Sequence, residues 1–186
     1  MWKAMRLFLV LTVLVGVVYP AVVTVAAMAM PYRAQGSLIR QNGAVVGSEL
    51  IGQSFANPKY FWSRPSATAP DPYNASASTP SNLGPTNKAL TDAVSERARA
   101  LREANPNATG PLPEDLLTAS ASGLDPHISP QAAMYQVPRV AAERSLPEAT
   151  VRTLVDKYTE GRQWGIFGEP RVSVLKLNLA LDSLGR

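Results

Sequence analysis

An uncharged apolar run near the start of the chain constrains its structure more than any other feature. From Leu7 to Met30 the sequence has no charged residue, and most side chains are aliphatic, aromatic or methionine. As an α-helix these 24 residues would span about 36 Å, against a bilayer hydrocarbon core of about 30 Å. The run therefore predicts one transmembrane helix over residues 7–30, with residues 1–6 on one side of the membrane and residues 31–186 on the other.

A cleaved signal peptide is the alternative interpretation of this run. The basic start of the chain fits a signal peptide, and Ala27-Met28-Ala29 has the A-x-A form of a cleavage site. The apolar part of a signal peptide, however, is only about 7–15 residues long. The length of the run therefore favours a retained membrane anchor.

The charges that flank the run indicate its orientation. Lys3 and Arg6 precede it closely, whereas Arg33 and Arg40 follow it more loosely. Positively charged residues accumulate on the cytoplasmic side of transmembrane helices. We therefore expect a cytoplasmic N-terminus and an extracytoplasmic C-terminal domain.

Small or polar residues recur along the predicted transmembrane helix. Thr12, Gly16, Pro20 and Thr24 are four residues apart and so fall near one helix face. Small residues on such a face let a second helix approach closely. This pattern predicts docking on a membrane partner; the alternative is a lipid-facing anchor in which the small residues are incidental.

Composition excludes several classes of function. The chain has no cysteine and a single histidine, which excludes disulfides, thiol catalysis and zinc–thiolate sites and disfavours histidine-based metal sites. All acidic residues follow the apolar run, so the rest of the chain has a formal charge of only +2. The overall basicity is therefore no sign of nucleic-acid binding.

The remaining sequence predicts one α+β domain with a long irregular segment. Asn42-Gly43 between apolar stretches predicts a hairpin of Leu38–Gln41 and Gly43–Ile51. The following segment, Phe55–Pro85, is rich in proline and serine but keeps several aromatic residues, which predicts an ordered loop pinned to the core; a flexible insertion is the alternative.

Helical patterns dominate the second half of the chain. Apolar residues repeat at helical spacing in Lys88–Ala104, and a short turn is expected at Glu114–Thr118. Ser129-Pro130 predicts a capped helix start, with a break or kink at Pro138. We expect a further helix from Ser145 to Gly161, a strand at Arg171–Lys176 and a short terminal helix at Leu177–Leu184.

Two short segments are candidate functional sites. Asp125, His127 and Ser129 could suggest a catalytic triad, but triad members normally come from separate elements. Their spacing is better explained by a turn at Asp125-Pro126 and a helix cap at Ser129, or by a loop that faces a partner.

The second segment precedes the helix predicted at Lys88. Helix N-termini bind anions, so this segment is a candidate nucleotide- or phosphate-binding site, although a simple helix cap is the more common explanation. The candidate residues are Ser81, Asn82, Gly84, Thr86 and Asn87. We find neither a phosphate-binding G-x-x-x-x-G-K-[ST] loop nor a G-x-G-x-x-G motif in the sequence.

Six segments, in order along the chain, resemble the C subunit of the potassium-transporting Kdp ATPase, a bacterial P-type pump complex. They are Gly47–Phe55 (GSELIGQSF), Tyr60–Ala67 (YFWSRPSA), Ser81–Asn87 (SNLGPTN), Thr118–Pro130 (TASASGLDPHISP), Tyr135–Ala142 (YQVPRVAA) and Gly168–Asp182 (GEPRVSVLKLNLALD).

The resemblance implies a non-catalytic accessory subunit of a potassium uptake complex in the bacterial inner membrane. Its partners would be a channel-like potassium-binding subunit, a catalytic P-type subunit and a small hydrophobic subunit. The resemblance further implies that it raises the ATP affinity of the catalytic subunit. No cofactor of this chain itself is expected; ATP would be met only through the complex, with Ser81–Asn87 as the candidate place of contact. The predicted extracytoplasmic domain instead favours assembly, or a cap or gate at the potassium entrance. An independent membrane-anchored periplasmic hydrolase or binding protein is the alternative.

Overall fold

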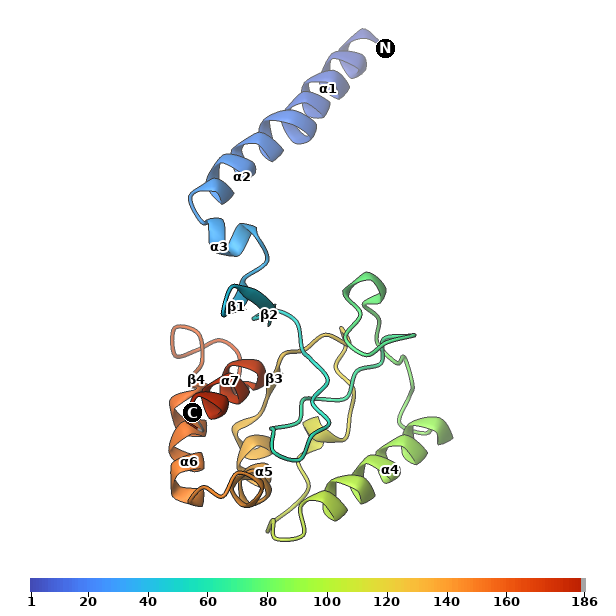
Figure 1. Ribbon diagram of the computed structural model, residues 1–186. Helices are drawn as coiled ribbons and strands as arrows, with labels where there is room; N and C mark the ends of the chain where they lie inside the picture. The colour runs from blue at the N-terminus through green and yellow to red at the C-terminus, as the bar shows by residue number, and fades with distance from the viewer. Residues whose placement is uncertain (185–186) are drawn as a thin grey trace. The chain divides into compact units, whose positions relative to one another are not determined.

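The computed structural model describes residues 1–184, and the chain divides into two compact units. The first unit, Met1–Ser48, holds an apolar helix and a hairpin, and the second begins at Glu49 and contains helices with a small sheet (Figure 1). This arrangement confirms the predicted α+β class with a single N-terminal apolar helix.

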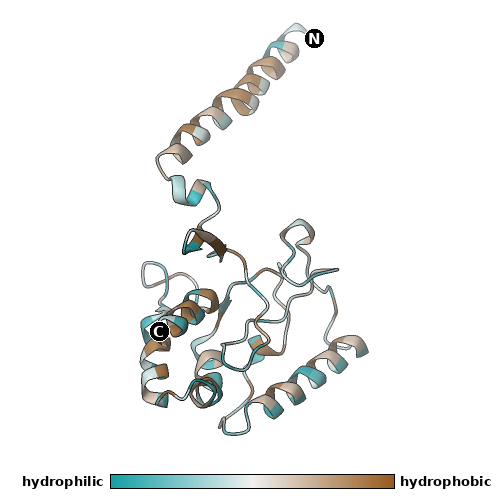
Figure 2. Cartoon of the chain, viewed as in Figure 1, coloured by the Kyte–Doolittle hydropathy of each residue, from teal (hydrophilic) through white to brown (hydrophobic). Residues whose placement is uncertain are grey.

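The first unit begins with a continuous helix from Trp2 to Met28. It consists of α1 (Trp2–Val13), a π-helical turn (Leu14–Val18) and α2 (Tyr19–Met28). Its surface is apolar over nearly its full length (Figure 2), and no side chain in it is buried. Within residues 1–184 it is the one helix long and apolar enough to cross a membrane.

The π-helical turn lies directly before Pro20, which has no N–H to donate. In this wider turn Tyr19 N donates to Leu14 O, five residues back. The rearrangement accommodates the proline without ending the helix. The helix ends at Met28, and a short helix α3 (Pro31–Ala34) follows.

The predicted hairpin is confirmed. Strand β1 (Leu38–Gln41) pairs with β2 (Ala44–Ser48) in antiparallel fashion. Asn42 and Gly43 between them have φ values of 52° and 81°, as the tight turn requires. The second strand ends at Ser48, three residues before the predicted limit at Ile51.

Over its described residues, 49–184, the second unit has four α-helices and a three-stranded antiparallel sheet with the strand order β3-β5-β4. In Figure 1, α4 lies on the side of this unit opposite α6 and α7. The helices are α4 (Lys88–Ala104), α5 (Pro130–Glu143), α6 (Glu148–Lys157) and α7 (Val174–Leu184). The strands are β3 (His127–Ile128), β4 (Thr159–Glu160) and β5 (Arg171–Ser173), and single 3₁₀ turns occur at Ala75–Ala77 and Glu114–Leu116.

Three predicted boundaries in this unit were wrong. Helix α5 continues through Pro138, so of the predicted break or kink the break does not occur; Val137 and Val140 beside the proline are fully buried, and this packing holds the helix together. Helix α6 ends at Lys157 because the chain turns into β4, so Gly161 lies beyond its end. The last helix starts at Val174, which shortens the predicted strand to three residues.

The core lies between α5, α6, α7 and β5. Val151 and Val155 of α6, and Leu177 and Leu181 of α7, are completely buried. Val172 and Ser173 on the central strand β5 are both buried, so this strand is covered on both faces. Burial of this apolar surface is the main stabilising contribution to the unit.

The irregular segment that precedes α4 is attached to this core, as predicted. Phe61 is fully buried, and Trp62 N donates to the side-chain Oε1 of Gln136 at 2.8 Å. The buried guanidinium of Arg139 lies 4.3 Å from the centre of the Trp62 ring and donates to Tyr60 O at 3.0 Å. Burial lowers the pKa of Arg139 to about 10, so the group stays charged at neutral pH.

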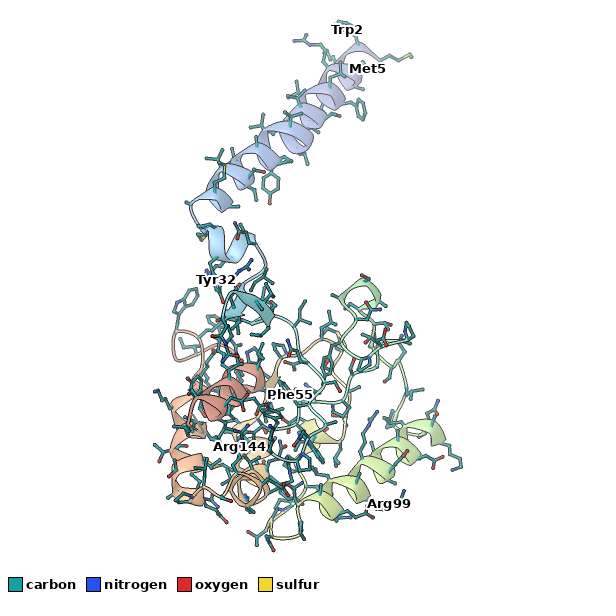
Figure 3. The ribbon with its side chains drawn as sticks, viewed as in Figure 1. Trp2, Met5, Tyr32, Phe55, Arg99 and Arg144 are labelled. Atoms are coloured by element: carbon teal, nitrogen blue, oxygen red, sulfur yellow. The ribbon has the colours of Figure 1, made fainter. Side chains whose placement is uncertain are left out.

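Helix α4 packs less tightly than the other long helices of this unit. Of its residues only Leu101 is buried, and the rest of the predicted apolar stripe is partly exposed. Its outer face carries Arg99, which points into solvent (Figure 3) and lies 4.0 Å from Glu103. Such an exposed pair contributes little stability.

Candidate functional site

The loop before α5 holds Asp125 and His127 close together. His127 N donates to Asp125 Oδ1 at 3.0 Å, and His127 Nδ1 lies 3.5 Å from the same oxygen. The second carboxylate oxygen, Oδ2, accepts a hydrogen bond from Arg64 Nη1 at 3.2 Å. Asp125 therefore links the irregular segment to the start of the sheet.

These contacts shift the ionisation of Asp125. Burial is the largest influence and by itself favours the neutral acid. The hydrogen bonds from His127 and the positive charge of Arg64 together outweigh burial, so the pKa of Asp125 is below its usual value. The carboxylate is thus ionised at neutral pH.

Ser129 is held in a structural role at the start of α5. Its Oγ accepts from Ala132 N at 3.0 Å, which caps the helix as predicted. The same hydroxyl donates to Asp115 Oδ1 at 3.1 Å, and Ser129 N donates to Asp115 Oδ2 at 2.7 Å. The hydroxyl is therefore directed at Asp115, and His127 is directed at Asp125, an arrangement unlike that of a nucleophile with its base.

Asp125, His127 and Ser129 nevertheless share one polar hollow of about 350 Å³. Two arginines and three carboxylates line it, so it carries both signs of charge. Such a mixed surface can pair with charged side chains of a partner protein. Its lining residues are Arg64, Asp115, Asp125, His127, Ile128, Ser129, Glu169, Pro170 and Arg171.

The second candidate segment, Ser81–Asn87, is an exposed turn before α4. Asn87 caps the helix, because its Oδ1 accepts from Ala89 N at 2.9 Å. Asn87 N donates to Gly84 O at 3.0 Å, which closes the turn, and Asn82 has a positive φ of 53°. Ser81, Asn82, Gly84, Thr86 and Asn87 are all exposed, and nucleotide binding by them stays a prediction.

A larger apolar cavity of about 400 Å³ lies between α4 and the irregular segment. Phe55, Trp62 and Tyr73 supply aromatic walls, and Arg64 also lines the cavity. Burial raises the pKa of the Tyr73 hydroxyl, which donates to Arg64 O. The size and lining are those of a ligand pocket or of a seat for a partner side chain.

The four small or polar residues of the N-terminal helix are open to the outside. Thr12 and Thr24 donate their hydroxyl protons to Phe8 O and Pro20 O, each at 2.8 Å. A Cβ added to Gly16 would meet nothing within 4 Å. Four residues of α-helix exceed a full turn by about 40°, whereas four residues of the wider π-helical turn fall short of one. The π turn therefore offsets the drift and keeps the four residues close to one face.

Among the residues described, 1–184, no three His, Cys, Asp or Glu side chains gather in a group that could hold a metal ion. Near the candidate loop, Asp125 contacts Arg64 and His127, and Asp115 accepts hydrogen bonds from Ser129.

Comparison with known proteins decides the family. The family model of the K+-transporting ATPase c chain, KdpC, matches residues 1–183. The chain belongs to the KdpC family. A potassium-transporting ATPase KdpC subunit from Dechloromonas aromatica is 60% identical over 184 residues, which cover 98% of this chain and 96% of that protein.

Other KdpC relatives are similar over nearly their full length. The KdpC subunit of Methylococcus capsulatus is 59% identical over 97% of this chain and 96% of its own. That of Burkholderia orbicola is 61% identical over 95% of this chain and 92% of its own. The resemblance found in the sequence is therefore confirmed.

Several side chains that shape the polar hollow and the apolar cavity were not identified from the sequence. Arg64 and Asp115 complete the polar hollow, yet each lies far from Asp125 or Ser129 along the chain. Arg64 stands in the resembling segment Tyr60–Ala67, which was the one available signal. The apolar cavity depends on how α4 packs against an irregular segment, and no periodic pattern reports such packing.

Proposed function

We propose that this chain is a non-catalytic accessory subunit of a high-affinity, ATP-driven potassium uptake complex of the Kdp type. Membership of the KdpC family over nearly the whole chain is the observation that carries the proposal. The structural roles of Ser129 and Asp125 support it, since both groups are committed to a helix cap and an ion pair. ATP hydrolysis then takes place on another chain.

The proposed partners are a channel-like potassium-binding subunit, a catalytic P-type subunit and a small hydrophobic subunit in the bacterial inner membrane. The helix Trp2–Met28 crosses the membrane once and docks on one of them through Thr12, Gly16, Pro20 and Thr24. The open surface around Gly16 supports this docking, because small side chains allow backbones to approach closely.

The second unit acts on the extracytoplasmic side, where it supports assembly or caps and gates the potassium entrance. The polar hollow with Asp125, His127 and Ser129 offers charged groups of both signs for a partner subunit. A direct increase in the ATP affinity of the catalytic subunit would instead require this unit, with Ser81–Asn87, to face the cytoplasm.

Co-purification with the complex tests the docking of the helix. We expect Gly16→Leu to lower the amount of this chain recovered with its partners by about tenfold, a cost of about 1.4 kcal/mol. Ala26→Leu is the matched control, because it adds a similar side chain near the opposite face and should leave recovery unchanged. Equal recovery of both variants would refute docking through the small-residue face.

A further inference from the structure

The connection between β4 and β5 projects three large apolar side chains into solvent. We refer to residues 161–170 as the Trp164 loop. Trp164 is 89% exposed, Ile166 is 70% exposed and Phe167 is 58% exposed. From Glu49 to Leu184 the other exposed large hydrophobic residues are Leu50, Leu83 and Leu184, each in a different segment. The Trp164 loop is therefore where apolar exposure is concentrated in this unit.

The loop is a self-contained turn. Gln163 N donates to Phe167 O at 2.8 Å, and Phe167 N donates to Gln163 O at 2.9 Å. Gly165 N and Ile166 N also donate to carbonyls within the loop, each at 3.1 Å. These four amides keep their partners when water is removed, which lowers the cost of moving the tip into an apolar medium.

Side-chain contacts brace the same turn. The rings of Trp164 and Phe167 meet nearly edge to face, with centroids 6.0 Å apart. At the base of the loop, Arg162 and Glu169 form an ion pair at 2.7 Å. The apolar side chains are thus presented on a preformed support, and little ordering remains to oppose binding.

Ion pairs connect the base of the loop to the first residue of the second unit. Lys176 Nζ lies 3.0 Å from Glu49 Oε1 and 3.9 Å from Glu160 Oε1. Glu160 is the last residue of β4, directly before the loop, and it also pairs with Arg171 at 3.1 Å. The Trp164 loop therefore emerges from the part of the unit at which the chain arrives from the membrane helix.

The connecting chain is short. Leu38 pairs with Ser48 in the hairpin, so residues 38–48 return on themselves and add little reach. About nine residues remain between Met28 and the hairpin, which span at most about 30 Å. This connection is short enough to let Glu49, and with it the base of the Trp164 loop, come close to the bilayer in which the helix Trp2–Met28 is held.

We propose that the Trp164 loop inserts its tip into the interface of the lipid bilayer and serves as a second membrane contact of this chain. From Gln163 to Gly168 the tip has no charged residue, and the Arg162–Glu169 pair below it is neutral as a whole. Insertion thus depends on apolar burial and on the preference of Trp for the interface, and it needs no anionic lipid.

Depth-dependent quenching of tryptophan emission tests the proposal. The full chain with Trp2→Phe is reconstituted alone into vesicles of phosphatidylcholine, with and without bromine on the acyl chains near the head groups. The further change Trp164→Phe keeps the tip apolar and identifies the emission of Trp164 by difference, so that Trp62 serves as the internal reference. We expect brominated lipid to quench Trp164 about twofold or more and Trp62 much less.

Ile166→Asp with Phe167→Asp is the disrupting variant and should abolish the quenching of Trp164. Flotation with the vesicles shows separately that the helix Trp2–Met28 is inserted, so a failure of the anchor is distinguishable from a failure of the loop. Unquenched Trp164 in floated vesicles would overturn the proposal. Trp164 that is shielded only when the other subunits are present would also overturn it, since a protein surface would then be its partner.

Discussion

The carboxamide of Asn178 on α7 brackets the backbone of Phe61. Phe61 N donates to Asn178 Oδ1 and Asn178 Nδ2 donates to Phe61 O, each at 2.9 Å. Both residues are almost completely buried. Gln136 on α5 makes the same pair of bonds with the next residue, Trp62, at 2.8 and 3.2 Å. The buried side-chain amides of Asn178 and Gln136 thus make the backbone hydrogen bonds that a neighbouring strand would otherwise make with this irregular segment.

Asn178→Leu should strongly destabilise the second unit. The change keeps the side-chain volume but leaves the buried N–H and C=O of Phe61 without partners, which costs about 2–4 kcal/mol in the free energy of unfolding. Denaturant unfolding of the full chain in detergent, followed by Trp62 fluorescence, measures it. Ser183→Ala near the exposed end of α7 is the control, and a loss below about 1 kcal/mol for Asn178→Leu would contradict the bracket.

Gly52→Ala should also destabilise the fold, for a steric reason. A Cβ at Gly52 would lie 2.5 Å from Asp125 O and 2.6 Å from the Tyr73 ring. Because one neighbour is backbone, the chain itself must shift, and we expect a loss of about 1–3 kcal/mol. Thermal unfolding of the full chain measures this loss. Gly161→Ala is the matched control, because a Cβ there would meet nothing within 4 Å. Similar unfolding temperatures for the two variants would disprove the close approach.

The stability contributed by Asp125 should depend on pH. Its pKa is lower in the folded protein than the ordinary value of 3.8, so the folded state binds the proton less readily than the unfolded chain. The ionised carboxylate therefore stabilises the fold above about pH 4, and this contribution is lost as the pH falls through the folded pKa.

The variant Asp125→Asn measures this contribution directly. It should be less stable than the parent by on the order of 1 kcal/mol at neutral pH, with the difference shrinking below about pH 4. Unfolding curves at about pH 3, 5 and 7 provide the comparison, because they sample the protein below and above the pH at which the contribution of Asp125 is lost. A difference that stays constant through the acidic range would show that ionisation of Asp125 is not what stabilises the loop.

Ser129→Ala distinguishes a helix cap from a catalytic nucleophile. Loss of the cap to Ala132 N should cost about 1–2 kcal/mol of stability, whereas Ser129→Thr should retain most of it. Potassium transport by the complex should survive in both variants at a temperature at which they are folded. A hydrolytic activity of the chain that is abolished in Ser129→Ala at unchanged stability would instead favour a hydrolase.

Local signals were sufficient to predict many elements of this fold. The apolar period predicted Lys88–Ala104 with both ends correct, Ser129-Pro130 predicted the start of α5, and Asn42-Gly43 predicted the hairpin turn. Each depends on residues close in sequence, where capping, turn geometry and periodicity act.

Long-range packing determined the features that were missed. Pro138 should weaken a helix, but full burial of its neighbours Val137 and Val140 outweighs that local effect. Asn178, which bonds to Phe61, and Arg64, which bonds to Asp125, each lie more than fifty residues from that partner. A single sequence does not reveal such pairings. The predicted contact of Ser81–Asn87 with nucleotide depends on a partner subunit and on the side of the membrane that the second unit faces. The fold of the isolated chain tests neither.

The side of the membrane on which the second unit lies is the most direct test of the account. Ser183 is exposed near the end of α7, and Ser183→Cys would introduce the only cysteine of the chain. An impermeant thiol reagent should label it in intact cells whose outer barrier has been opened. Labelling only after lysis would contradict the account: the unit would then face the cytoplasm, where Ser81–Asn87 could contact nucleotide.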